Sequence, residues 1–168
     1  MMSDDTTSRL ALPLLQPGQA QKETTHNEAL TLLDLAVQAS VLAVGTNVPP
    51  ASPANGSAWI VGAAPTGGWA GQARAIAGWT AAGWRFVAPR EGMTAWSIAD
   101  GQAARFVGGV WTLGVLAGSR VSIGGNDVVG GRRAAISDPS GGTVVDGQAR
   151  VAIGAILGAL RGHGLIAG

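Results

Sequence analysis

The stretch that decides the fold runs from Gly56 to Trp111 and reads GSAWIVGAAPTGGWAGQARAIAGWTAAGWRFVAPREGMTAWSIADGQAARFVGGVW. It contains all six tryptophans of the chain, and tyrosine is absent. The tryptophans lie in or beside short alternating segments that glycine-containing turns separate, a spacing typical of small antiparallel β folds. We expect strands at about 57–62, 73–79, 83–88, 94–99, 103–107 and 110–113.

The tryptophans could form a core or a ligand surface. Trp79, Trp84 and Trp96 are expected to include core members, because a chain with two phenylalanines needs bulk from elsewhere. Trp69 and Trp111 lie among glycines and are the candidates for exposure, where a ring can stack on the apolar face of a sugar. Packing in the core is the alternative for each of them. The residues of this candidate carbohydrate site are Trp69, Trp111, Arg74, Arg85, Arg90 and Glu91.

An arm and a helix precede this stretch. Pro13 and Pro17 exclude a helix through the leucine-rich run 10–18, so we expect an extended arm docked on an apolar surface, with a ragged terminus as the alternative. Thr25 and Glu28 have capping-box spacing. Leu30, Leu33 and Val37 then repeat at helical spacing, and we expect the helix to end near Gln38 and a strand to follow at 40–44. Residues 19–23 could add an earlier helical turn.

The chain after the tryptophans is rich in glycine. Weak alternation predicts strands at 120–124 and 133–137, with turns at Asn126–Asp127 and 138–142. A helix is expected over 147–160, with Asp146 as its N-cap. Its stripe of isoleucine and leucine is flanked by glycines at spacing four, which favours close approach of another backbone. The predicted oligomer interface comprises Leu30, Leu33, Val37, Gly154, Leu157 and Gly158.

The predicted fold class is α+β and mainly β. It consists of an N-terminal arm and helix (1–45), a tryptophan-rich antiparallel barrel or sandwich (46–113), and glycine-rich strands with a C-terminal helix (114–168). Charged residues make up 12% of the chain and the net charge is +1, so nothing indicates binding to nucleic acid. No apolar run is long enough to insert in a membrane. A chain so rich in glycine and alanine is expected to bury surface against other copies of itself or against a partner.

The sequence predicts a protein without catalytic residues, cofactor or metal. Cysteine is absent, and His26 and His163 lie far apart along the chain. No phosphate-binding loop, nucleophile elbow or metal-ligand cluster is present. The carboxylate pair Glu91 and Asp100 is the one arrangement that could serve a polysaccharide depolymerase, and exposed turn positions are the alternative.

Two long, ordered sets of residues resemble a known family. The first set is Leu10–Pro13, Gln16–Glu23, His26–Leu30, Leu33–Asp34, Pro49–Pro50, Ser52–Pro53, Gly56, Gly68–Gly71, Gly83–Phe86 and Ala88–Gly92. It resembles a domain of unknown function found in alpha-proteobacterial prophages and gene transfer agents, where it opens tail-fibre-like and head-spike proteins. The second set resembles the tail that closes many of the same proteins: Val128–Gly130, Arg132, Ala135–Ile136, Asp138–Pro139, Gly141–Gly142, Asp146, Ala149–Arg150, Ala152–Ile153, Ile156–Leu157, Leu160–Arg161 and His163–Ile166.

The resemblance implies a structural protein on the surface of a phage-like particle. Because residues Met1–Asp5 carry acid where a signal peptide needs base, we expect it to be made in the bacterial cytoplasm without a signal peptide. Its expected partners are other copies of itself, capsid or fibre subunits, and the polysaccharide capsule of the host, with a carbohydrate-binding adhesin as the alternative function. The section between the two sets, about 113–127, is short, which suits a spike base or stubby spike better than a long fibre. Met93 stands where the resemblance leads us to expect an aromatic residue.

Overall fold

The computed structural model describes residues 6–15, 18, 22–141, 144, 146–163 and 165–167. The chain divides into two compact units, Met1–Val115 and Leu116–Gly168, called unit 1 and unit 2 below. The predicted segments 1–45 and 46–113 both lie in unit 1. The fold is α+β and mainly β, as predicted, and its described strands form open, sandwich-like sheets and no closed barrel. No described helix is long and apolar enough to cross a membrane.

Unit 1 contains two four-stranded sheets with the same plan. The first sheet has the order β1 (Ala39–Val41), β6 (Thr94–Ser97), β7 (Gln102–Val107) and β8 (Val110–Leu113). The second sheet has the order β2 (Val44–Thr46), β3 (Ala58–Val61), β4 (Ile76–Thr80) and β5 (Gly83–Val87). Each sheet is a three-stranded antiparallel meander to which one short strand of the segment 39–46 adds in parallel. The segment 40–44, which was predicted as a single strand, is therefore divided between β1 and β2, and these two strands belong to different sheets.

A core of small and branched side chains joins the two sheets. Val41 from the first sheet and Ile60 and Ile76 from the second are at most 1% exposed. They pack with Leu35 and with alanines on β1, β3, β6 and β7. Alanine at the facing positions lets the two layers approach closely, so the sandwich is filled with little aromatic bulk.

The other face of the second sheet carries the aromatic core. Trp59, Val61 and Ala77 pack there with Trp69, which the short 3-10 helix η1 (Gly67–Trp69) brings over the sheet. The ring of Trp84 lies 5.1 Å from that of Trp69 between centroids, and 5.7 Å from that of Trp59. Trp69 is fully buried, so the predicted exposure of this ring is wrong. The loop that seemed to isolate Trp69 folds back and covers the sheet.

Helix α1 (Lys22–Ala36) packs beside the sheets and begins earlier than predicted. Thr25 lies inside the helix, so the predicted capping box is wrong, and Glu28 binds Arg85 of β5 instead. Leu35 inserts against β4 at Gly78, where a Cβ atom would come within 2.2 Å of its Cδ2. Glycine at this position is what allows the helix to approach the sheet. The earlier turn expected at 19–23 agrees with α1 at Lys22 and Glu23, and residues 19–21 lie outside the described residues.

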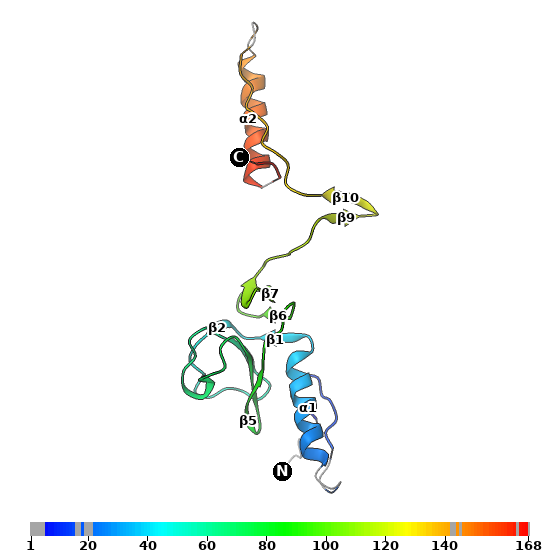
Figure 1. Ribbon diagram of the computed structural model, residues 1–168, viewed down its shortest axis with the longest axis vertical. Helices are drawn as coiled ribbons and strands as arrows, with labels where there is room; N and C mark the ends of the chain where they lie inside the picture. The colour runs from blue at the N-terminus through cyan, green and yellow to red at the C-terminus, as the bar shows by residue number, and fades with distance from the viewer. Residues whose placement is uncertain are drawn as a thin grey trace. The chain divides into compact units, whose positions relative to one another are not determined.

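The described part of the arm docks on α1 (Figure 1), but it is not extended as predicted, and the contacts that hold it include the polar side chains of Asp34 and Asn27. Thr6 and Pro13 form a β-bridge, and Thr7 and Leu12 are joined by a backbone hydrogen bond, so the arm folds back on itself. Other residues of the two family-like sets, namely Gln16, Pro17, Gly142 and Gly164, lie outside the described residues.

Unit 2 has the hairpin β9 (Val121–Ile123) and β10 (Asn126–Val129), followed by α2 (Gly147–Gly162). The Asp146 carboxylate accepts a hydrogen bond of 2.9 Å from the Ala149 amide, which confirms the predicted N-cap. The turn predicted at Asn126–Asp127 is wrong, because the turn is at Gly124–Gly125 and those residues begin β10. The strand predicted at 133–137 is also wrong: Arg133 makes a single bridge with Ile166.

Candidate functional site

A cavity of about 300 Å³ lies in unit 1 where the arm, α1 and the β4–β5 hairpin meet. Its lining combines apolar surface with a tryptophan, an ion pair and several polar side chains, and such a combination is a feature of ligand sites. The residues that matter for its chemistry are Thr7, Asn27, Glu28, Asp34, Trp79 and Arg85. Whether a ligand could use them depends on which are already engaged within the protein.

Asp34 is 4% exposed and fastens the arm to the end of α1. One carboxylate oxygen accepts hydrogen bonds from the Thr7 hydroxyl at 2.8 Å and the Leu10 amide at 2.6 Å. The other accepts from the Arg9 amide at 3.0 Å. The Arg9 guanidinium also donates to the carbonyls of Asp34 and Gln38. A buried carboxylate with three donors is fully satisfied and has little capacity left for a ligand.

Two more polar residues of the cavity are engaged in the same way. The Asn27 side chain donates to the Leu15 carbonyl and accepts from its amide, both at 2.9 Å. Glu28 and Arg85 form an ion pair with 2.7 Å between the nearest atoms, which ties α1 to β5. Asn27, Glu28, Asp34 and Arg85 all belong to the first family-like set. These residues hold the arm, helix and sheet together, and the cavity is a structural joint.

The predicted carbohydrate residues do not come together. Trp69 is buried, and Trp111 is half-buried: it packs on Phe106 and donates its ring N–H to the Arg74 carbonyl at 2.8 Å. Arg85 points to α1, away from its neighbour Trp84, because successive side chains of a strand alternate between faces. A sugar platform built on Trp69 is therefore excluded in this structure.

The predicted acidic residues are also separated. Glu91 accepts a hydrogen bond of 3.1 Å from the Gly108 amide, just after the end of β7. Asp100 lies just before the start of β7 and accepts a hydrogen bond of 2.5 Å from the Ser97 hydroxyl. Since β7 spans six residues, these positions are about 20 Å apart. The carboxyl groups of a glycosidase are within about 10 Å of one another, so this pair does not form such a site. Arg90 is exposed beside Glu91.

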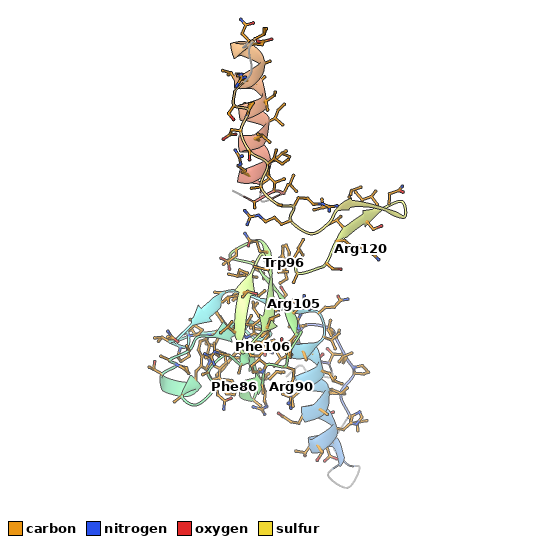
Figure 2. The ribbon with its side chains drawn as sticks, turned by 45° about the horizontal axis from the view of Figure 1, so that its top comes forward. Phe86, Arg90, Trp96, Arg105, Phe106 and Arg120 are labelled. Carbon is orange, nitrogen blue, oxygen red and sulfur yellow. The ribbon has the colours of Figure 1, made fainter. Side chains whose placement is uncertain are left out.

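The outward face of the first sheet carries an exposed tryptophan, Trp96. Trp96 is one of the three tryptophans expected to include core members, but 51% of it is exposed. Ala95 and Ser97 on either side of it are buried, so β6 presents Trp96 to solvent. Figure 2 labels Trp96 on β6 and Arg105 on the neighbouring β7. The sequence of β6 does not show which of its two faces is buried. Its buried residues, Ala95 and Ser97, are small, and exposed residues are often equally small.

The predicted interface residues have mixed positions. Leu33 and Val37 are about half exposed, at 50% and 47%, and Leu30 is half-buried. On α2 the Gly158 position is exposed, Gly154 is half-buried and Leu157 is buried at 6%. Leu157 therefore belongs to the small internal contact of unit 2. The apolar residues that α2 exposes most are Val151 and Ile156, at 74% and 60%.

Within the described part of the chain, no three or more histidine, aspartate or glutamate side chains gather as metal ligands. A family model described as "Protein of unknown function (DUF2793)" matches residues 26–112. The chain belongs to this family. The match runs from within α1 to β8, so it lies entirely in unit 1. No curated protein matches the chain.

Proposed function

We propose that this protein is an oligomeric structural component on the surface of a phage-like particle or gene transfer agent, as a head spike, spike base or short fibre. The family description assigns no activity to unit 1, and Thr7, Asn27, Glu28, Asp34 and Arg85 of its cavity are engaged in holding the fold together. The likeness of both ends of the chain to tail-fibre-like and head-spike proteins supports the particle context. Host attachment is an accompanying role.

The observation that carries this proposal is the apolar surface of unit 2. Among its described residues, the buried hydrophobic side chains are Leu157 and Ile166. The exposed large hydrophobic side chains are Leu116, Val121, Ile123, Val128, Val129, Ile136, Val144, Val151, Ile153, Ile156 and Leu165. Burying one such side chain is worth about 1.5–3 kcal/mol, so a surface of this kind is strongly favoured to associate.

The β9–β10 hairpin supports the same conclusion. Val121 and Ile123 point to one face, and Val129 pairs with Val121 on that face. All three are exposed, at 51%, 65% and 42%. A two-stranded hairpin is marginal in water without a third strand or a covering layer. Equivalent hairpins and α2 helices of other copies would supply that layer, and cyclic self-association is the commonest way to do so.

The experiment compares two exposed apolar residues in the full-length chain. Ile156→Asp places a charge in the proposed interface, whereas Val48→Asp changes a residue of unit 1 that is 64% exposed. We expect wild-type and Val48→Asp proteins to have the same multiple of the 16.7 kDa chain mass by light scattering, and Ile156→Asp to shift toward the monomer. A wild-type protein that stays monomeric at micromolar concentration would contradict the oligomeric part of the proposal.

The particle context needs a separate test. Particles induced from the bacterium that encodes the chain would be labelled with antibody to unit 1 and imaged. We expect label on the particle surface. Its absence from purified particles that contain the other structural proteins would refute the virion role while leaving the oligomer intact.

A further inference from the structure

The exposed face of the first sheet has the features of a binding surface that none of the above explains. Of the six tryptophans, Trp96 is the one that exposes more than half of its surface. A buried aromatic side chain removes about 150–250 Å² from water, so half exposure leaves roughly 2–3 kcal/mol of stabilisation unused. Unit 1 has an aromatic core on its second sheet, and yet β6 of the first sheet directs the ring of Trp96 to solvent.

The residues beside Trp96 leave its ring accessible. In the sheet register Ser40 of β1 lies opposite Trp96 on one side and Ala103 of β7 on the other. Both are small, so neither covers the ring. A shallow hollow of about 360 Å³ lies here, lined by Gln38, Ala39, Thr94, Ala95, Trp96 and Ala103. This volume is within the range of small-molecule sites.

A second row of outward residues runs beside the first. It consists of Thr94, Arg105 and Thr112, which are register partners on β6, β7 and β8. Diagonal neighbours across an antiparallel pair are about 7–8 Å apart, within reach of a long side chain, so Arg105 can reach the edge of the Trp96 ring. The two rows together place a flat apolar surface beside two hydroxyls and a guanidinium.

Arg105 gives the face a charge that no acidic side chain among the described residues pairs with. It is half-buried, and its guanidinium makes no hydrogen bond or ion pair within the described residues, in contrast to Arg85 and its partner Glu28. Neither row contains an acidic residue. Glu91 and Asp100 are held by Gly108 and Ser97. A guanidinium in this state is suited to a carboxylate, which it binds through two parallel hydrogen bonds.

We propose that this face binds a saccharide that carries a carboxylate, of the uronic acid class. The apolar face of the sugar ring stacks on Trp96, and the carboxylate pairs with Arg105. The sugar hydroxyls bond to the Thr94 hydroxyl and donate to the Thr112 oxygen, whose own proton goes to the Arg105 carbonyl at 3.2 Å. Stacking alone would accept neutral sugars, and Arg105 supplies the preference for the acidic one. The site lies within unit 1 and does not depend on the proposed oligomer, so either proposal can fail without the other.

Affinity electrophoresis of the full-length protein tests the site, with polygalacturonate or neutral dextran in the gel. We expect polygalacturonate to retard the wild-type protein more than dextran does. Trp96→Ala should weaken the apparent affinity at least tenfold. Arg105→Gln should abolish the preference for the acidic polymer. Circular dichroism and the melting temperature would verify that each variant is folded.

Two matched controls separate this site from general surface effects. Ile98→Ser changes a residue of the same segment with similar exposure, 55%, and Arg90→Gln removes an exposed arginine elsewhere in unit 1. Neither should alter the retardation. The proposal is overturned if wild-type protein is not retarded, if Trp96→Ala behaves as wild type, or if Arg90→Gln loses as much as Arg105→Gln. It is also overturned if Trp96→Ala and Ile98→Ser both lower the oligomeric mass without affecting retardation, since the face is then a protein contact.

Discussion

The β7–β8 and β9–β10 hairpins are built alike but have different surroundings. Two glycines close each hairpin with positive φ angles, +60° and +80° at Gly108–Gly109 and +58° and +81° at Gly124–Gly125, which is the geometry of a type I′ turn. The first hairpin extends a four-stranded sheet that packs on a second layer. The second is a two-stranded ribbon with exposed valines and isoleucine. Local turn chemistry forms a hairpin in either case, but only unit 1 supplies the layer that buries it.

The largest expected effect comes from the same substitution in each unit. Ile60→Ala empties a site that is 1% exposed and should destabilise unit 1 by about 2–5 kcal/mol, at any protein concentration. Ile156→Ala removes a side chain that is 60% exposed, so it should leave the unfolding of unit 1 unchanged and weaken the oligomer. Denaturant unfolding at two protein concentrations, followed by tryptophan fluorescence and light scattering, distinguishes them. If both variants lost the same free energy of unfolding at every protein concentration, α2 would be shown to pack within its own chain.

Two glycines, Gly78 in unit 1 and Gly158 in unit 2, give the comparison with the next largest expected effect. At Gly78 a Cβ atom would meet the buried Leu35 side chain, so Gly78→Ala should cost about 1–3 kcal/mol and loosen α1. At Gly158 nothing lies within 4 Å in the single chain. Gly158→Ala should therefore stabilise the isolated helix by up to about 1 kcal/mol, but weaken the oligomer if another backbone packs there. Thermal melts measure the change in stability of each variant, and light scattering measures the change in the oligomeric mass. An oligomer that Gly158→Ala leaves unaffected would remove Gly158 from the interface.

The smallest expected effect contrasts two aspartates. Asp34→Asn leaves a donor facing the Arg9 amide and should cost about 1–2 kcal/mol, and it should make the arm sensitive to limited proteolysis. Asp138, whose side chain is 66% exposed, pairs with Arg161 at 3.0 Å, and Asp138→Asn should change stability by less than about 1 kcal/mol. Protease resistance of the arm in Asp34→Asn would mean that the leucines, and not Asp34, fasten it.

Alternation and turn residues were sufficient to predict the strands of unit 1. The predicted segments 57–62, 83–88, 94–99, 103–107 and 110–113 each contain the observed strand or nearly all of it. These signals are local, because a hairpin is specified by its own turn and the residues that flank it. The helices were predicted from their own periodicity, although the capping box expected at Thr25 and Glu28 is not formed, because Glu28 binds Arg85, 57 residues away.

The burial of individual tryptophans could not be predicted in this way. Trp69 lies in a glycine-rich loop and is buried only because that loop covers the second sheet. Trp96 lies in an alternating strand whose two faces look equally suitable, and the inward one is set by Val41 and Ile60 from other strands. The role of Asp34 was equally hidden, since its partners are 24 to 27 residues away in the arm. The candidate sugar site consequently moved from Trp69 and Trp111 to Trp96.

The short strand β1 has a mechanical consequence. β1 and β8 are the outer strands of the first sheet, and the pairing of β6 and β7 between them makes β1 and β8 parallel. The chain therefore enters this sheet at the start of one edge strand and leaves it at the far end of the other. Tension between α1 and the residues after β8 would pull the two edges in opposite directions along the strands. The hydrogen bonds of the sheet would then share the force in shear instead of opening one after another, as suits a part held at one end and pulled at the other.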